Sequence, residues 1–272
     1  MREITPVVKQ LLIINIIFFI GSELIGTQAK ELFSLYYFES TKFKFWQPIT
    51  HMFMHGGIMH IAFNMFALYS FGSMLESIWG GKKFLFFYIS CGLGAAALHT
   101  GINYIEIHNI LNGTSDLNLA QQSINQILSL SVSDETVYRP DLFLKELEPI
   151  LNNLGKSKMI DELSFNSLFE AAKLSQIPVV GASGAIYGLL VAFAFMFPDA
   201  RLAMLFIPVP IKAKYFVTGI LAIDLFLGVK GNSIFGGSGT GVAHFAHIGG
   251  ALIGFIMMWY WKKNSFNDKR WN

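Results

Sequence analysis

Long apolar windows recur along the chain and predict its main secondary structure. A helix needs about 20 mostly apolar residues to cross a hydrocarbon core of about 30 Å. Six windows approach that length, at residues 8–26, 57–76, 83–102, 179–197, 214–229 and 243–262. No small-residue cleavage site follows the first window before Glu31, so we interpret it as a retained helix and not as a signal peptide.

A polar stretch separates the third window from the fourth. It contains a turn-forming run, NGTSD, at residues 112–116, followed by three weak helical patterns. Four leucines between residues 144 and 154 share one helical face, although Pro149 predicts a kink or a split. Residues 102–176 carry ten acidic and five basic side chains, a net charge of −5. This pattern predicts an inserted soluble segment.

Composition agrees with a membrane protein. The chain is 53% hydrophobic and 14% charged, with 26 phenylalanines, which is too apolar for an ordinary soluble domain. The net charge is +2 and the basic residues are scattered, so nothing indicates nucleic acid as a partner. The single cysteine, Cys91, excludes an internal disulfide and a cysteine-based metal site.

Lysine and arginine in short loops predict the orientation, because they favour the cytoplasm. In a six-span chain, eleven fall on one side: Arg2, Lys9, Lys82, Lys83, Arg201, Lys212, Lys214, Lys262, Lys263, Lys269 and Arg270. Four fall on the other: Lys30, Lys42, Lys44 and Lys230. Both termini are expected in the cytoplasm, and the membrane is expected to be a bacterial inner membrane.

These patterns predict an all-α, polytopic bundle of six transmembrane helices with an extracytoplasmic helical insert. Residues 1–102 would form spans one to three, residues 103–176 the insert, and residues 177–272 spans four to six.

Polar residues inside spans are costly and usually face the bundle interior or a water-filled cavity. The second span contains His60 and Asn64, one turn apart, below a loop with His51 and His55. The fourth span opens with GASG at residues 181–184, and the sixth with HFAH at residues 244–247.

Ser183 is a candidate nucleophile. Gly181 and Gly184 flank it and would let another backbone and a substrate chain come close. The alternative is a serine that packs helices or bonds to a carbonyl one turn back.

His247 is a candidate base. Gly250 and Gly254 follow it on the same helical face, and Gly184 and Gly188 give the fourth span a matching stripe. Two such faces can pack closely and bring the histidine to the serine hydroxyl. A neutral imidazole could then take the serine proton and later protonate the leaving amine.

Three neighbours bear on this prediction. Tyr187, one turn below Ser183, could stack on the imidazole. A metal site with His244 is the alternative reading of His247, but two histidines without a third ligand are a weak metal signal. Asp224 falls inside the fifth span, where we expect it to lie too deep to orient His247, so a dyad is favoured over a triad.

Peptide hydrolysis also creates an oxyanion that needs hydrogen-bond donors. His60, Asn64 and the Ser183 amide are the candidates. The alternative for His60 and Asn64 is that they only bond to neighbouring spans.

These motifs resemble those of the rhomboid intramembrane proteases over nearly all of the chain except the insert. The segments that carry the resemblance are 51–55, 60–64, 75–80, 181–188 and 246–250 together with Gly254. The resemblance implies a Ser-His dyad in a water-filled cavity that opens to the outside and cleaves transmembrane substrates near helix ends. A Trp-Arg pair common in the family's first loop is Trp46-Gln47 here, which leaves the arginine's role open, and the long insert is a second departure.

Two other functions compete with proteolysis. One is an inactive relative that binds membrane clients, although such proteins usually lack the dyad. The other is a transporter or proton channel that uses intramembrane histidines with Asp224 and Glu76, for which no inverted repeat is seen. No cofactor is expected, the expected partners are transmembrane substrates and the bilayer, and the oligomeric state stays open.

Overall fold

The computed structural model describes residues 3–134, 137–204, 207–231 and 244–265. Helices dominate the described chain, together with one two-stranded sheet. The first half contains α1 (Pro6–Ile25), α2 (Thr27–Phe33), α3 (Gln47–Thr50), η1 (His51–Phe53), α4 (Ile58–Ala67), η2 (Leu68–Gly72), α5 (Ser73–Trp79), α6 (Gly81–Leu111) and η3 (Asn112–Leu117). The second contains α7 (Gln121–Leu128), α8 (Pro140–Asn153), α9 (Glu162–Gln176), α10 (Ser183–Met196), β1 (Arg201–Met204), β2 (Ile207–Lys212), α11 (Ala213–Gly231) and α12 (His244–Ser265).

All six predicted spans fall on helices. Three helical segments are long and apolar enough to cross a membrane, at Pro6–Ile25, Ile58–Trp79 and Gly81–Leu117, and Ser183–Met196 is a shorter apolar helix. The fifth and sixth windows become α11 and α12, of 19 and 22 residues. The six-span count stays a prediction.

The second span is not a uniform α-helix. It begins as α4, passes through the π-helical turn η2, and ends as α5. At Gly72 in this turn, a Cβ would meet Val8 at 3.0 Å and Phe84 at 3.2 Å. The π-turn therefore coincides with a tight contact among α1, α6 and the second span.

Glu76 joins the beginning of the bundle to the end of the second span. Its carboxylate is buried and accepts hydrogen bonds from the Val7 and Val8 amides at 2.9 and 2.8 Å. These donors are the free N–H groups of the first turn of α1, which has no side-chain cap of its own. Glu76 thus caps the first turn of α1 from the second span.

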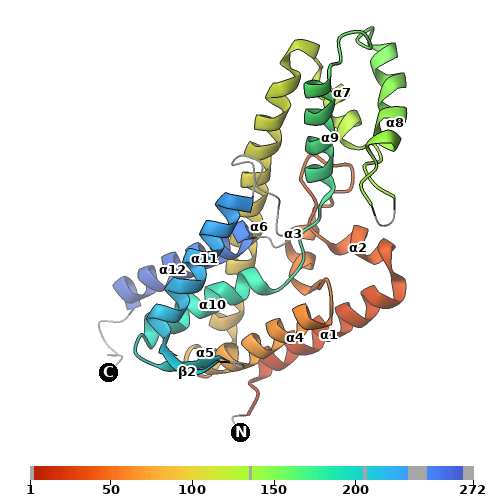
Figure 1. Ribbon diagram of the computed structural model, residues 1–272. Coiled ribbons are helices and arrows are strands. Elements are labelled where there is room, and N and C mark those ends of the chain that lie inside the picture. The colour runs from red at the N-terminus through yellow and green to blue at the C-terminus, as the bar shows by residue number, and fades with distance from the viewer. Residues whose placement is uncertain (1–2, 135–136, 205–206, 232–243, 266–272) are drawn as a thin grey trace.

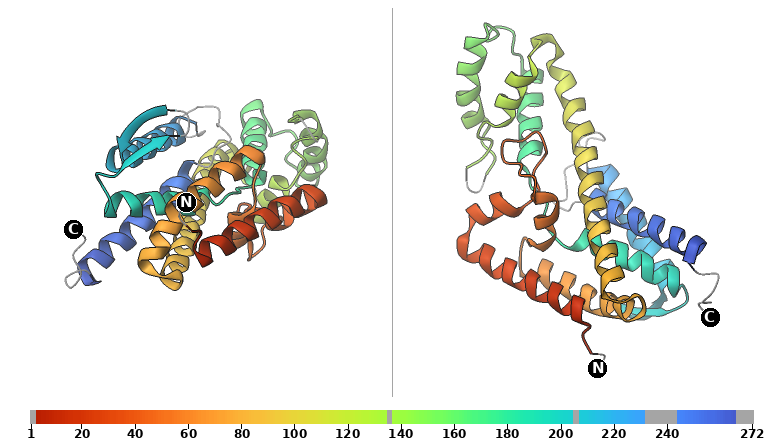
Figure 2. Two further views of the ribbon diagram at one scale, coloured as in Figure 1. Left: turned by 90° about the horizontal axis from the view of Figure 1, so that it is seen from below. Right: turned by 180° about the vertical axis from the view of Figure 1, so that it is seen from behind.

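The insert forms a helical unit at one end of the molecule. In Figure 1, α6 extends beyond the other core helices and α7, α8 and α9 gather beside its far end, opposite the beginning of α1 and β2. A second apolar core fills the unit, including Ile107, Leu117, Phe143, Leu147 and Leu168. The views in Figure 2 show the same separation of this unit from the hairpin end.

Three local expectations need correction. The third predicted span ends at residue 102, but α6 runs unbroken to Leu111, so the expected boundary at 102 falls inside a helix. Pro149 does not split α8. Proline has no N–H, so the Lys145 carbonyl loses its helical partner. Both residues are exposed, and water can therefore bond to that carbonyl. The strands β1 and β2 were not predicted, because two prolines within β2 weaken the strand signal.

Candidate active site

Ser183 is the first residue of α10, preceded by an extended segment. The fourth predicted span begins at residue 179, but α10 begins only at Ser183. Val179 instead forms an antiparallel bridge with Leu35. The Gly181 amide donates to the His51 carbonyl at 2.9 Å. These bonds keep residues 179–181 out of the helix, and the Ser183 amide lies at a helix N-terminus, where N–H groups lack helical partners.

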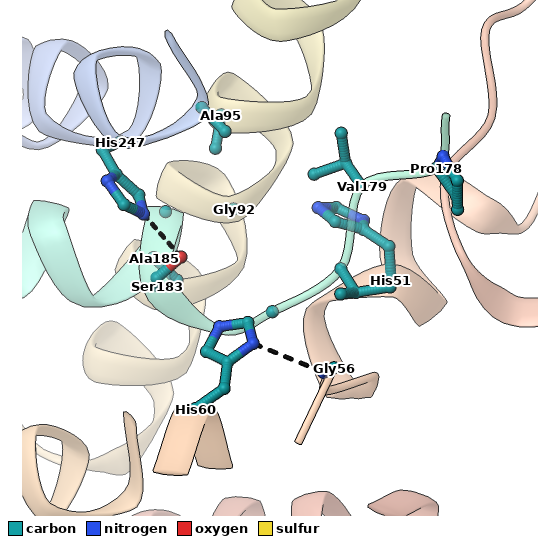
Figure 3. Close-up of a pocket in the computed structure, with 14 residues that line it drawn as sticks. His51, Gly56, His60, Gly92, Ala95, Pro178, Val179, Ser183, Ala185 and His247 are labelled. Atoms are coloured by element: carbon teal, nitrogen blue, oxygen red, sulfur yellow. Dashed lines mark hydrogen bonds between the residues drawn. The ribbon is translucent and has the colours of Figure 1, made fainter. Parts of the chain in front are cut away.

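The predicted contact between Ser183 and His247 is present. His247 Nε2 lies 2.8 Å from Ser183 Oγ. The Tyr187 ring stacks on the imidazole with centroids 4.2 Å apart and planes 11° apart, as expected. Figure 3 shows the serine between the rings of His247 and His60.

Glycines allow this approach of α10 to α12. A Cβ on Gly254 would lie 2.8 Å from Gly188 Cα, and one on Gly188 would lie 3.1 Å from Gly250 O. Gly184 lies against Ala246 O, where a Cβ would be 3.3 Å away. The two glycine stripes therefore face each other, as the sequence predicted.

Asp224 contradicts the expectation that it lies too deep to reach His247. Its Oδ1 is 3.2 Å from His247 Nδ1 and 2.6 Å from His244 Nδ1. Gly228, one turn further along α11, packs so closely on the start of α12 that a Cβ there would lie 3.2 Å from the His244 side chain. This close contact between α11 and α12 brings Asp224 to the depth of His247. The position of Asp224 in the sequence of its span does not show this contact.

Asp224, His244 and His247 are also the residues that could hold a metal ion. Their ligand atoms lie within 4.8 Å of one another. The 2.6 Å separation of His244 Nδ1 from Asp224 Oδ1 is a hydrogen-bond distance, whereas two ligands of a tetrahedral zinc ion are about 3.3 Å apart. The geometry as it stands therefore fits a hydrogen-bonded cluster.

The candidate oxyanion donors approach the serine from α4. A Cβ on Gly181 would lie 2.8 Å from His60 Nε2 and 3.6 Å from Ser183 Oγ, so both side chains lie close to the space that a side chain at residue 181 would fill. Gly181 has a φ of +125°, which favours glycine. Asn64 is buried, and its Nδ2 has no hydrogen-bond partner within the described part of the chain.

A cavity of about 340 Å³ opens beside these groups. Its lining includes Ser183, His247, His60, Gly181 and His51. Asn64, one turn further along α4 than His60, is not among the lining residues. Figure 3 shows His51 and Val179 on the side of the cavity away from His247.

A family model described as the rhomboid domain matches residues 42–117 and 159–264. The chain belongs to the rhomboid family. This confirms the resemblance expected from the motifs, and with it a helical bundle built into the membrane. The match omits residues 118–158 of this rhomboid, which contain α7 and α8, so these two helices are the part of the insert that lies outside the family domain.

Gln47 stands where the family's arginine was expected, and this rhomboid uses it to fix the first loop. Its side chain is fully buried. Nε2 donates to the carbonyls of Glu31 and Lys42, each at 3.0 Å, and Oε1 accepts from the Tyr36 amide at 3.3 Å. A neutral amide can satisfy this loop because it supplies both donors and an acceptor.

The loop histidines are buried beside the site. His51 Nδ1 donates to the Gln47 carbonyl at 3.0 Å, and burial lowers the pKa of His51 to about 4. The His55 ring lies edge-on to His60, with centroids 5.0 Å apart, and burial, followed by the nearby His60, lowers the pKa of His55 to about 4. The sequence analysis assigned His51 no role at the site. The signal that could have indicated one is the HMFMH segment at residues 51–55, which contains His51.

Proposed function

We propose that this rhomboid is an intramembrane serine endopeptidase that hydrolyses peptide bonds of transmembrane substrates. The supporting observation is the 2.8 Å contact between His247 Nε2 and Ser183 Oγ at the wall of the cavity. A serine that only packed helices would need neither a histidine partner nor a cavity.

The chemistry follows from these positions. Ser183 Oγ attacks the substrate carbonyl carbon while its proton passes to His247 Nε2. Donors from His60, Asn64 and the Ser183 amide would stabilise the oxyanion. The imidazolium then protonates the leaving amine, and a water molecule, deprotonated by His247, hydrolyses the acyl-enzyme.

The proposed orientation places both termini in the cytoplasm of a bacterial cell and the insert outside. The beginning of α1 and the β2 strand lie at one end of the molecule, and α7–α9 lie at the other (Figure 1). Basic residues Lys212 and Lys214 belong to the first end, as expected for a cytoplasmic face.

We assign substrate selection, and no chemistry, to the insert. The catalytic candidates all lie in α4, α10 and α12, whereas the insert has its own core beside the far end of α6. Its net charge of −5 favours basic juxtamembrane segments of substrates.

A fluorophosphonate probe tests the proposed activity. Ser183 should be the labelled residue by mass spectrometry, and EDTA should leave both labelling and cleavage of a transmembrane substrate unchanged. Ser183→Ala and His247→Ala should each abolish cleavage, and the double variant should resemble either single variant because the pair acts as a unit. Substantial turnover by folded Ser183→Ala protein would contradict the assignment, and a protein that binds substrates without labelling would instead be an inactive client-binding relative.

A further inference from the structure

The insert meets the cavity wall at the end of α9. This helix ends at Gln176, and three residues that follow it, Pro178, Val179 and Val180, line the cavity. In Figure 1 the chain leaves α9 and runs directly into α10, which begins with Ser183. A shift of the end of α9 would therefore move the cavity wall, which starts only two residues further along the chain.

Gln176 ties this end of α9 to α7. Its Nε2 donates to the Leu128 carbonyl at 2.9 Å and to the Leu130 carbonyl at 2.8 Å. Leu128 is the last residue of α7, and the last carbonyls of a helix have no helical partner. A primary amide has two N–H donors, so this one side chain satisfies both carbonyls.

Ser175 lies beside the same carbonyls but does not replace this link. Its buried hydroxyl is 3.2 Å from the Leu128 carbonyl and 2.9 Å from the carbonyl of Ala172 on its own helix. A hydroxyl has a single hydrogen to donate, and the nearer acceptor belongs to α9 itself. Gln176 therefore supplies the firmer bonds between α9 and the end of α7.

Apolar packing connects these two helices to the first loop. Leu128 at the end of α7, Ala172 on α9 and Tyr37 in the first loop are buried in one core. Leu35, two residues before Tyr37, exchanges two backbone hydrogen bonds with Val179, at 3.0 and 2.8 Å. The segment before the serine is thus held along its length by the first loop and at its beginning by α9.

We infer that Gln176 is a positioning residue, which anchors the end of α9 to α7 and thereby sets where Pro178 and Val179 stand in the cavity wall and how tightly a substrate chain binds there. The anchor α7 lies within residues 118–158, which the family model does not match, so this support comes from outside the family domain. The inference rests on the proposed protease activity. It gives the insert a route to substrate selection that does not depend on charge.

The proposed catalytic pair is held by other contacts. Ser183 and His247 are brought together by the glycines between α10 and α12. The Gly181 amide is fixed separately, by the His51 carbonyl at 2.9 Å. Loss of the Gln176 bonds should therefore change the binding of a long substrate more than the reaction of a small probe with Ser183.

Gln176→Glu in the full-length protein tests this inference, because a carboxylate cannot donate to the two carbonyls. We expect KM for a transmembrane substrate to rise about fivefold, with kcat and the rate of fluorophosphonate labelling within about twofold of the wild type. Gln121→Glu is the matched control, since Gln121 is exposed on α7 and bonds to Asn125 of the same helix, and KM should not change. If Gln176→Glu does not fold, Gln176→Met repeats the test, because it removes both donors without adding a charge.

Hydrogen exchange gives a second readout that does not need activity. The amides of residues 177–181 should exchange about tenfold faster in the Gln176 variants, because the segment loses its fixed beginning, whereas those of α12 should exchange as in the wild type. Unchanged exchange and KM in a folded variant, or cleavage and labelling slowed equally, would overturn the role of Gln176. Wild-type protein that neither cleaves nor labels would overturn the proposed protease, and the exchange measurement would still test the link between α9 and α7.

Discussion

Gly250 on α12 lies directly against the backbone carbonyl of Gly184 on α10, leaving no space for a side chain. An added Cβ would overlap that carbonyl, which is a rigid atom and not the end of a flexible chain. Ser183 and His247 each lie within one turn before the glycine of their own helix. The separation of the proposed catalytic pair therefore depends on two residues without side chains.

Gly250→Ala should consequently impair both stability and activity. Overpacking of this kind costs about 1–3 kcal/mol, and the helices can accommodate it only by moving apart. We expect a lower thermal midpoint and at least tenfold slower fluorophosphonate labelling of Ser183. Gly219→Ala on α11 is the control, since a Cβ there has no heavy atom within 4 Å; equal effects of the two changes would show that the contact is not specific.

Asn64→Ala should lower kcat by about 10- to 10³-fold, because one lost oxyanion donor commonly costs a few kcal/mol of transition-state stabilisation. His60→Ala should be at least as severe, since His60 lines the cavity. Steady-state kinetics with a transmembrane substrate measures both. A normal rate in either variant would make that residue a packing group only.

The buried loop histidines predict a loss of stability in acid. His51 has a folded-state pKa of about 4, below the ordinary value of 6.5, so the unfolded chain binds the proton more readily between these values. Stability should therefore be complete above pH 6.5 and decrease as the pH falls toward 4, by about 3 kcal/mol for this histidine. His55 adds a change of the same sign.

Unfolding in detergent at pH 7.5 and pH 4.5 measures this loss. His51→Gln should be less stable at pH 7.5 but should show a smaller difference between the two pH values than the wild type. His108→Gln, on the partly exposed far end of α6, is the control and should keep the wild-type difference. An unchanged difference in His51→Gln would contradict the assignment.

The negative charge of the insert should affect which substrates the protein cleaves efficiently. Asp116, Glu148 and Glu162 are exposed, and their replacement by Asn, Gln and Gln removes three negative charges without disturbing the insert core. At low salt we expect a severalfold lower kcat/KM for a substrate with basic juxtamembrane residues and little change for a neutral one. The difference should vanish near 1 M salt, where the Debye length is about 3 Å; a salt-independent difference would indicate contacts other than charge.

The sequence by itself determined the elements that depend on local pattern. Hydropathy identified the apolar helices, because a span must be apolar over its own length whatever its neighbours. The glycine stripes predicted which faces of α10 and α12 would meet, and the polar residues within the spans predicted where Ser183, His247 and Tyr187 would gather. Each of these inferences used spacing within one or two helices.

The tertiary structure decided which residues of different helices contact each other, because the hydropathy pattern does not give the relative depth of the helices. Asp224 precedes His247 by 23 residues, and its level depends on how closely α11 approaches α12 at Gly228. Gln47 could be assigned a task only when the loop carbonyls around it were in place. A hydropathy window records how apolar a segment is but not its tilt or its contacts, and those variables decide whether Asp224, a carboxylate within a span, reaches His247.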